Sequence, residues 1–320
     1  MTDRQKSPGR MLYSALKLGV VALIFFFLVR VLVRNWSELG RHEFGIDPVY
    51  LIGSALMLIP AYAGTFLLWD LLTRWLGVSV ALGRAVGHYA ISALGKYVPG
   101  KVWMPAARFV LYEREGKGRA LLSVAVAMEP LLHAAGSAAI FLVAVLIVGE
   151  QQVRFLAGVV PLVLAALAVA MHPRILERLL NAGLRMLGRD PVRIRIRYRD
   201  VIFLLVLYIA LYQVYYLSFF LLIRCVYHLP LQQFPYIALC CSAAGIVSMI
   251  AVFAPAGLGV REGMFFLLLR GVMPESLAVI VALLNRIVTL LVELAVIGIV
   301  LLVSKRSVRY DEAPKGEQSV

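Results

Sequence analysis

The stretch GKYVPGKVWMPAAR, from Gly95 to Arg108, is out of place in its surroundings. It carries two lysines, an arginine, two prolines and two glycines, yet long apolar runs flank it on both sides. Proline and glycine interrupt helices, and interrupted backbone at membrane depth is tolerated only against protein or a water-filled cavity. The stretch therefore predicts a broken helix that helps to build a site inside a membrane protein.

The composition of the whole chain points to the same environment. Of its 320 residues, 62% are hydrophobic and only 16% are charged, and the mean hydropathy is +0.87. A soluble domain of this length could not bury that much apolar surface. Six runs have the length or composition of membrane spans, and we take all six as full transmembrane helices. They are residues 11–33, 49–69, 120–148, 155–171, 201–223 and 276–303.

The basic residues predict which loops face the cytoplasm. The net charge is +14, from 32 basic and 18 acidic residues, and the excess lies mostly in loops beside apolar runs. Because basic loops remain on the cytoplasmic side, we expect residues 1–10, the basic loop 172–200 and the tail 304–320 to be cytoplasmic. We expect a multi-pass protein of a bacterial inner membrane, and this distribution of charge does not favour nucleic acid as a partner.

The number of membrane crossings requires two segments that enter and leave on the same side. If every apolar stretch crossed once, the basic loop 172–200 would lie outside. The conflict disappears if residues 85–107 dip in from the cytoplasm and residues 235–271 dip in from the outside. Each segment contains a helix-breaking motif, the second being APAGLGVREG at residues 254–263. The expected breaks are Pro99, Gly100, Pro255, Gly257 and Gly259.

These observations predict an all-α polytopic membrane protein. It would contain six full transmembrane helices and two opposed re-entrant broken-helix hairpins. The hairpins divide the chain into a first membrane repeat at residues 11–148 and a second, inverted one at residues 149–303. Many secondary transporters are built from such inverted repeats, and their binding sites form where the broken helices meet.

Ionisable residues inside the apolar segments are the candidates for a substrate site. Each costs roughly 2.5–3.5 kcal/mol at mid-membrane on insertion scales, so its presence there needs a reason. The cations could hold a lipid phosphate, with the carboxylates orienting them; alternatively, the charges pair with one another and only join helices. The candidate residues are Lys96, Lys101, Arg108, Glu129, Arg261, Glu262, Arg286 and Glu293.

Two further patterns leave alternatives open. In the basic loop 172–200, leucines recur at helical spacing and VRIRIRYR alternates apolar with basic residues, which fits a segment lying on anionic headgroups. Regulation or partner binding is the other interpretation. The aromatic stripe at residues 208–220 lines a lipid path or packs in the core, and His88 and His133 are expected to be satisfied packing residues.

Motifs of soluble catalytic sites do not occur in the sequence. It has no P-loop, GxSxG or HExxH motif, and its three cysteines, Cys225, Cys240 and Cys241, lack metal-ligand spacing. We therefore expect a protein without a metal or cofactor that is not an enzyme.

The motifs GKYVPGKVW and APAGLGVREG, followed by an arginine in ALLNRIV, resemble the transmembrane region of lysylphosphatidylglycerol synthetases. Their P-G-G-x-G-x-x-E pattern falls on Pro255, Gly257, Gly259 and Glu262. The sequence departs from this pattern at Ala256, where the family has glycine. It also departs from the family at Glu129-Pro130, because a Glu-Arg pair is common in the fourth segment. The resemblance implies the flippase part of these proteins. The soluble aminoacyltransferase domain of the full synthetase is not expected here.

The leading hypothesis is a flippase-like transporter that moves an anionic phospholipid or a lipid-linked intermediate between leaflets. One alternative is an integral-membrane transferase acting on a lipid-linked substrate, with Glu129 or Glu262 as base. The other is a scaffold for an enzyme of lipid or glycan-lipid synthesis. Expected partners are therefore lipids with anionic headgroups and synthesis enzymes of that kind, and oligomerisation is left open.

Overall fold

A computed structural model describes residues 45–98, 102–149, 156–186, 188, 191–251 and 254–311. All regular structure in these ranges is helical, as predicted. The first half contains α3 (Pro48–Trp75), α4 (Leu82–Ala93), η1 (Leu94–Tyr97), α5 (Trp103–Arg114) and α6 (Arg119–Val148). The second half contains α8 (Leu156–Ala170), α9 (Pro173–Met186), α10 (Tyr198–Arg224), η2 (Leu231–Gln233), α11 (Phe234–Ile250), η3 (Pro255–Gly257), α12 (Val260–Leu269) and α13 (Glu275–Asp311).

Local sequence signals set several helix ends. Asp47 caps α3 by accepting a hydrogen bond from the Val49 N–H at 2.9 Å, and a proline follows it at the first helical position. Asp200 accepts from the Arg197 N–H at 3.1 Å at the start of α10. Gly149, with a φ of 67°, ends α6 in the left-handed conformation that glycine adopts readily. These signals place the helix ends close to the limits of the apolar runs.

Five helical segments of the described chain are long and apolar enough to cross a membrane. They are Pro48–Trp75, Arg119–Val148, Tyr198–Arg224, Leu231–Ile250 and Glu275–Ser304. Four coincide with predicted spans; the predicted span at residues 11–33 lies outside the described residues. Two other helices differ in length from the expectation. In the described ranges α8 has 15 residues, about 22 Å, while the segment Leu231–Ile250, expected as half of a hairpin, has the length of a span.

Both expected breaks separate pairs of helices. Pro99, Gly100 and Lys101 lie outside the described residues, but α4 and α5 on either side have 12 residues each. A helix of that length spans about 18 Å, too little to cross a bilayer core of about 30 Å. The second break, η3, separates α11 from α12, which has 10 residues.

The backbone at the second break uses the left-handed region. Gly257 and Gly259 have φ values of 71° and 78°, which glycine adopts without steric cost. Ala256, at the position where the family motif has glycine, has a φ of 50°. Three residues of this motif therefore have positive φ values at the turn between α11 and α12.

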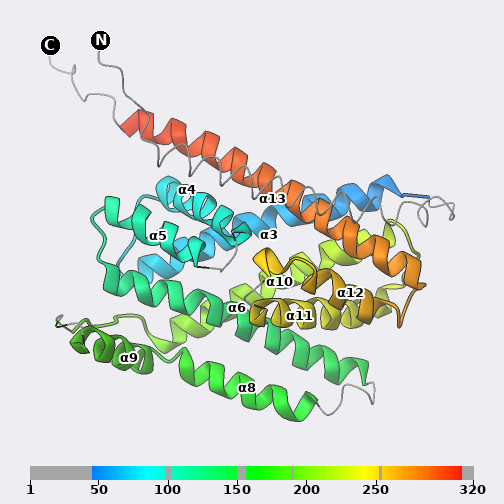
Figure 1. The fold of residues 1–320 in the computed structure, drawn as a ribbon, viewed down its shortest axis with the longest axis horizontal. Helices are drawn as coiled ribbons and strands as arrows, with labels where there is room; N and C mark the ends of the chain where they lie inside the picture. Colours follow the sequence, from blue (N-terminus) through cyan, green and yellow to red (C-terminus); the bar gives the residue numbers. More distant parts are fainter. Residues whose placement is uncertain are drawn as a thin grey trace.

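The long helices run roughly along the longest axis of the molecule, and the two broken pairs open toward opposite ends of it (Figure 1). The loops on either side of the α4–α5 pair lie at the end that also holds α9. The start of α11 and the end of α12 lie at the other end. The tips of the two pairs meet, because η1 contacts η3, and α13 packs against α3, α4 and α12.

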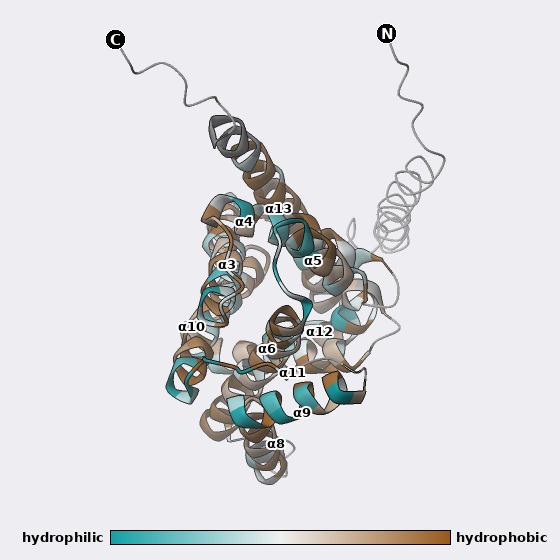
Figure 2. Cartoon of the chain, turned by 90° about the vertical axis from the view of Figure 1, so that its left-hand side faces the viewer, coloured by the Kyte–Doolittle hydropathy of each residue, from teal (hydrophilic) through white to brown (hydrophobic). Residues whose placement is uncertain are grey.

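Two apolar clusters form the packed core, one toward each end of the helix bundle. One surrounds Trp69 and Leu72 of α3 and includes residues from α4, the first half of α6 and the start of α10. The other surrounds Phe219 and Phe265 and joins α10, α11, α12 and the first half of α13. The end that carries α9 shows strongly hydrophilic residues on α4, α5 and α9 (Figure 2). The polar centre described below lies between the two clusters.

Two predicted segments contain helix. Helix α13 continues to Asp311, past residue 304, where the tail was expected to begin. The basic loop 172–200 is largely structured, with α9 inside it and the first turn of α10 at its end. Leu176 and Leu184 of α9 are buried, whereas Leu179, expected on the same face, is 66% exposed.

Candidate functional site

A cavity of about 550 Å³ lies where the two broken helix pairs approach each other. Residues from α3, α4, η1, α5, α6, α10, α11, η3, α12 and α13 line it. It is therefore formed by both halves of the chain. Six of the predicted site residues are among its lining: Lys96, Arg108, Glu129, Arg261, Arg286 and Glu293.

Arg108 and Glu129 form a buried ion pair that joins α5 to α6. Their side chains are 2% and 7% exposed, and both terminal nitrogens of Arg108 donate to the carboxylate. The Tyr89 hydroxyl also donates to Glu129, at 2.9 Å. The guanidinium lies 3.9 Å from the ring centre of Trp69, and its Nε donates to the Ser92 hydroxyl at 3.2 Å. Each charged group is thus fully engaged, as a helix-joining pair requires.

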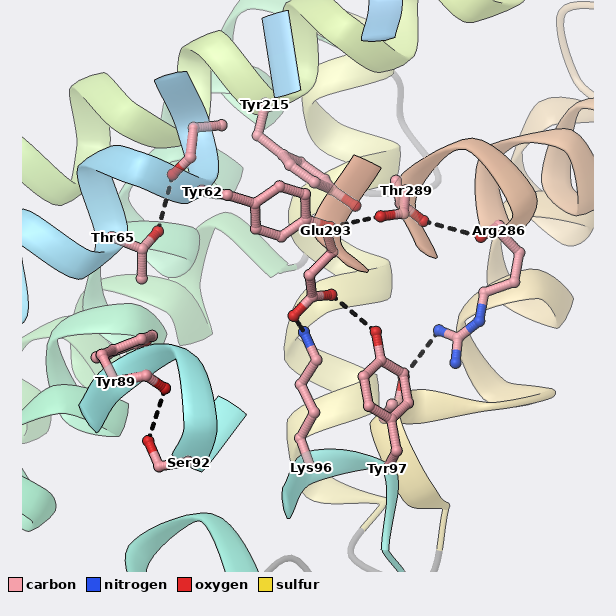
Figure 3. A network of polar contacts seen from close by, with 12 residues as sticks. Tyr62, Thr65, Tyr89, Ser92, Lys96, Tyr97, Tyr215, Arg286, Thr289 and Glu293 are labelled. Carbon is pink, nitrogen blue, oxygen red and sulfur yellow. Dashed lines mark hydrogen bonds and ion pairs between the residues drawn. The ribbon is translucent and has the colours of Figure 1, made fainter. Parts of the chain in front are cut away.

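A second ionic group connects the first break to α13. Glu293, on α13, lies between Lys96 and Tyr97 of η1 (Figure 3). It forms an ion pair with the Lys96 ammonium group and accepts a hydrogen bond from the Tyr97 hydroxyl at 2.8 Å. The Glu293 side chain is 5% exposed and that of Lys96 is 34% exposed. The lysine is therefore partly exposed, whereas the carboxylate is largely buried by its two partners.

Arg286 connects the second break to the same helix. It lies seven residues before Glu293, two helical turns away on one face of α13. Its Nη1 donates to the Ala256 carbonyl of η3 at 3.1 Å, and its Nε lies 3.7 Å from a carboxylate oxygen of Glu262. Glu262 also accepts from the Gly259 N–H at 2.7 Å, at the start of α12. The Arg286 side chain is 8% exposed, yet its Nε and Nη2 make no hydrogen bond.

Arg261 is the cation of the cavity without a carboxylate partner among the described residues. Its Nη1 donates to the Tyr215 hydroxyl at 3.3 Å, a bond near the upper limit of length. Its buried Nε makes no hydrogen bond. Lys96, Arg108 and Arg286 each have a carboxylate, and Arg261 gives the cavity one positive charge in excess.

Tyrosines form much of the wall, and the sequence pattern indicated only some of them. Tyr208, Tyr212, Tyr215 and Tyr216 of the aromatic stripe line the cavity, while Phe219 and Phe220 pack in the core. Tyr62, Tyr89 and Tyr97 were missed. The available signal was a phenol within an apolar run, where a buried hydroxyl needs a partner.

The remaining predicted residues are placed as follows. Glu262 is not part of the lining but touches it through Arg286, and Lys101, Pro99 and Gly100 lie outside the described residues. His133 does line the cavity and forms a 2.7 Å hydrogen bond with the Tyr212 hydroxyl, whereas His88 lies 3.7 Å from Glu115. Within the described ranges, no group of histidine, cysteine and acidic residues could hold a metal ion.

Comparison with known proteins identifies the family of the chain. The sequence profile of the lysylphosphatidylglycerol synthase TM region matches residues 14–297, nearly the whole chain. No curated protein compared with the chain matches it significantly. The chain is a multi-pass membrane protein, and it belongs to the family of the lysylphosphatidylglycerol synthase transmembrane region.

Proposed function

We propose that this chain is a flippase-like transporter that moves an anionic phospholipid or a lipid-linked intermediate between the leaflets of a bacterial inner membrane. The observation that carries the proposal is the excess cation in the cavity. Arg261 has no carboxylate partner in the described chain, and the neighbouring Arg286 has nitrogens without hydrogen bonds. Buried donors of this kind are costly unless a ligand accepts hydrogen bonds from them.

The unpaired groups favour an anionic headgroup over a cationic one. Both carboxylates of the cavity wall are already engaged, Glu129 by Arg108 and Glu293 by Lys96 and Tyr97. The groups that lack partners are donors. A phosphate offers several acceptor oxygens and suits arginine well.

The position of the cavity supports movement across the bilayer. We infer that α4 and α5 form a hairpin open to the cytoplasm, and that α11 and α12 form one open to the outside. Glu293 and Arg286 fasten the two breaks to one face of α13. Small shifts of either hairpin along α13 would then open the cavity to one leaflet or the other, as in inverted-repeat transporters.

Substitution of Arg261 with glutamine tests the proposal with little risk to the fold. Because Arg261 has no carboxylate partner among the described residues, its loss leaves no buried anion behind. A charge-assisted hydrogen bond contributes about 1.5–3 kcal/mol, so the rate of lipid exposure should fall roughly 10- to 100-fold. The measurement is the rate at which labelled phosphatidylglycerol becomes accessible in the opposite leaflet of proteoliposomes.

The matched control is Arg270→Gln, because Arg270 is an exposed arginine at the far end of α12, with a side chain 51% exposed. Its transport rate should equal that of the native chain. Arg261→Lys keeps the charge and should retain part of the activity. Equal rates for the native chain and Arg261→Gln would contradict the proposed role of the cavity.

The proposed orientation can be tested with introduced cysteines. The three natural cysteines are buried and should not react with a membrane-impermeant thiol reagent. Lys117→Cys, in the loop between α5 and α6, should be labelled only after the cytoplasmic side is exposed. His228→Cys, in the exposed turn after α10, should be labelled in intact cells whose outer membrane is permeabilised. Labelling of both from one side would rule out the opposed hairpins.

The geometry gives less support to a transferase. Its proposed bases were Glu129 and Glu262. Glu129 is held by two nitrogens of Arg108 and a tyrosine hydroxyl, and Glu262 lies against a guanidinium while capping α12. A carboxylate held by cations is a weak base, because the cations stabilise its ionised form.

A further inference from the structure

The segment that joins α8 to α10 presents a basic surface that the transport cavity does not use. It consists of α9 and of the extended stretch at residues 191–197. Two residues of α9 fix this stretch against the helix. Asn181 exchanges hydrogen bonds with Val192 at 2.7 and 3.0 Å, and Glu177 accepts from the Ile194 N–H at 2.9 Å. The stretch is therefore held in one register although it belongs to no sheet.

In this register, the apolar and the basic residues of the stretch lie on opposite sides. Ile194 and Ile196 turn inward and belong to the apolar packing of this end of the bundle. The residues between and beside them are all exposed, and all are arginines. We call these three arginines, together with Arg199 in the first turn of α10, the arginine comb: Arg193, Arg195, Arg197 and Arg199. Alternate residues of an extended chain lie about 6.6 Å apart, so Arg193, Arg195 and Arg197 form a row of positive charge that Arg199 follows in the chain.

Helix α9 has three distinct faces. Leu176 and Leu184 are buried against the protein. Arg174, Arg178 and Arg185 are exposed and, at about 100° per residue, fall within about 40° of one another. The third face is apolar and also exposed.

This third face consists of Leu179 and Met186, whose exposed fractions are 66% and 89%. It lies about 110° around the helix from the three arginines. A helix with one face on protein, one apolar face uncovered and one basic face has the pattern of a helix at a membrane interface, where lipid tails cover the apolar side.

The carboxylates that the structure describes near this surface do not neutralise it. Glu177 accepts a backbone hydrogen bond from Ile194, and Asp200 accepts one from Arg197 while lying 3.6 Å from Arg199. In the described ranges, Arg174, Arg178, Arg185, Arg193, Arg195 and Arg197 form no ion pair with a side chain. Their guanidinium groups are therefore available to an anionic partner.

We propose that α9 and the arginine comb form a docking surface for the headgroups of anionic phospholipids in the surrounding membrane. Phospholipid fits all the features together, because its tails cover Leu179 and Met186 while its phosphates meet the arginines. A soluble acidic protein or a nucleic acid would match the charge but would leave the apolar face in water. The surface lies at the end of the helix bundle that also carries the hydrophilic residues of α4 and α5 (Figures 1 and 2).

The test compares two lipids beside one fluorescent label. Met186→Cys places a label next to the surface, and the three natural cysteines are buried and should remain unlabelled. The chain is placed in phosphatidylcholine nanodiscs containing a trace of nitroxide-labelled phosphatidylglycerol or the same nitroxide on phosphatidylcholine. One arginine near an anionic surface contributes about a fivefold preference, so quenching should report at least about fivefold enrichment of phosphatidylglycerol. High salt should reduce it.

Variants assign the effect to the comb. Arg193→Gln, Arg195→Gln, Arg197→Gln and Arg199→Gln, made together, should bring the ratio of the two lipids close to one. The four corresponding lysine substitutions keep the charge and should preserve most of the enrichment. A label at His228→Cys, at the opposite end of the molecule, should show no preference. Equal quenching by both lipids beside the native comb, or enrichment that persists in the glutamine variant, would overturn the proposal.

Discussion

Replacing Glu129 with alanine is expected to destabilise the folded chain by about 3–5 kcal/mol, because it leaves the Arg108 guanidinium charged and without its carboxylate. Arg108 is 2% exposed and its guanidinium lies 3.9 Å from the ring centre of Trp69, so little of the charged group reaches solvent. Equilibrium unfolding in mixed micelles measures the loss. The rate of lipid exposure, corrected for the folded fraction, should change much less.

The double variant Arg108→Met with Glu129→Leu is the control that separates charge from packing. Replacing a buried pair by apolar residues of similar volume is often neutral or stabilising, since neither ion then has to be desolvated. We expect the double variant to recover most of the stability lost in Glu129→Ala. A single variant as stable as the native chain would show that Arg108 finds another partner and would contradict the assignment of this pair to the fold.

The charged residues thus divide into two roles that the sequence had offered as alternatives. Arg108 and Glu129 satisfy each other and have no group left for a ligand. Arg261 lacks a carboxylate in the described chain, and Arg286 keeps unpaired nitrogens. Lys96 and Glu293 are intermediate, since the pair is made but the lysine is 34% exposed. Burial is costly for every one of these charged residues, which is why they could be recognised as candidates in the sequence. That cost alone does not distinguish a ligand-binding role from a helix-joining one.

The partners of the charged residues could not be predicted without the fold. Lys96 and Glu293 are almost 200 residues apart, and only the packing of η1 on α13 brings them together. Spacing within a helix, the pattern available in the sequence, places Glu129 and His133 four residues apart on one face of α6 instead. Tyr62 was overlooked for a related reason: it lies in a charge-free run, and its direction toward the cavity is set by neighbouring helices.

The breaks were predictable because proline and glycine act locally. Pro255, Gly257 and Gly259 lie at the turn that they were expected to cause. The helix lengths on either side were less predictable. α11 is longer than the half-helix expected, and no local signal in its apolar sequence marks where a half-helix would end. Ala256 adopts the left-handed backbone region where glycine is favoured, at some cost in strain.

Replacing Gly95 with alanine should disrupt the first hairpin, although the change adds only one methyl group. A Cβ atom at Gly95 would lie 2.6 Å from the Met104 nitrogen and 2.8 Å from the Trp103 carbonyl carbon. These are backbone atoms, and they cannot rotate aside as a side chain could. We expect the free energy of unfolding to fall by about 1–3 kcal/mol, as for other forced overpacking. Equilibrium unfolding in mixed micelles measures it.

The transport rate should fall further than this loss of stability explains. Lys96 and Tyr97 follow Gly95 directly, and both bind Glu293, so moving η1 away from α5 changes the ion pair that fastens the first break to α13. Gly263→Ala is the matched control, since no atom lies within 4 Å of a Cβ added there, inside a helix. It should be neutral or stabilise by about 0.5–1 kcal/mol. If both variants transport lipid at the native rate, the close approach of η1 to α5 is not needed for the cavity to work.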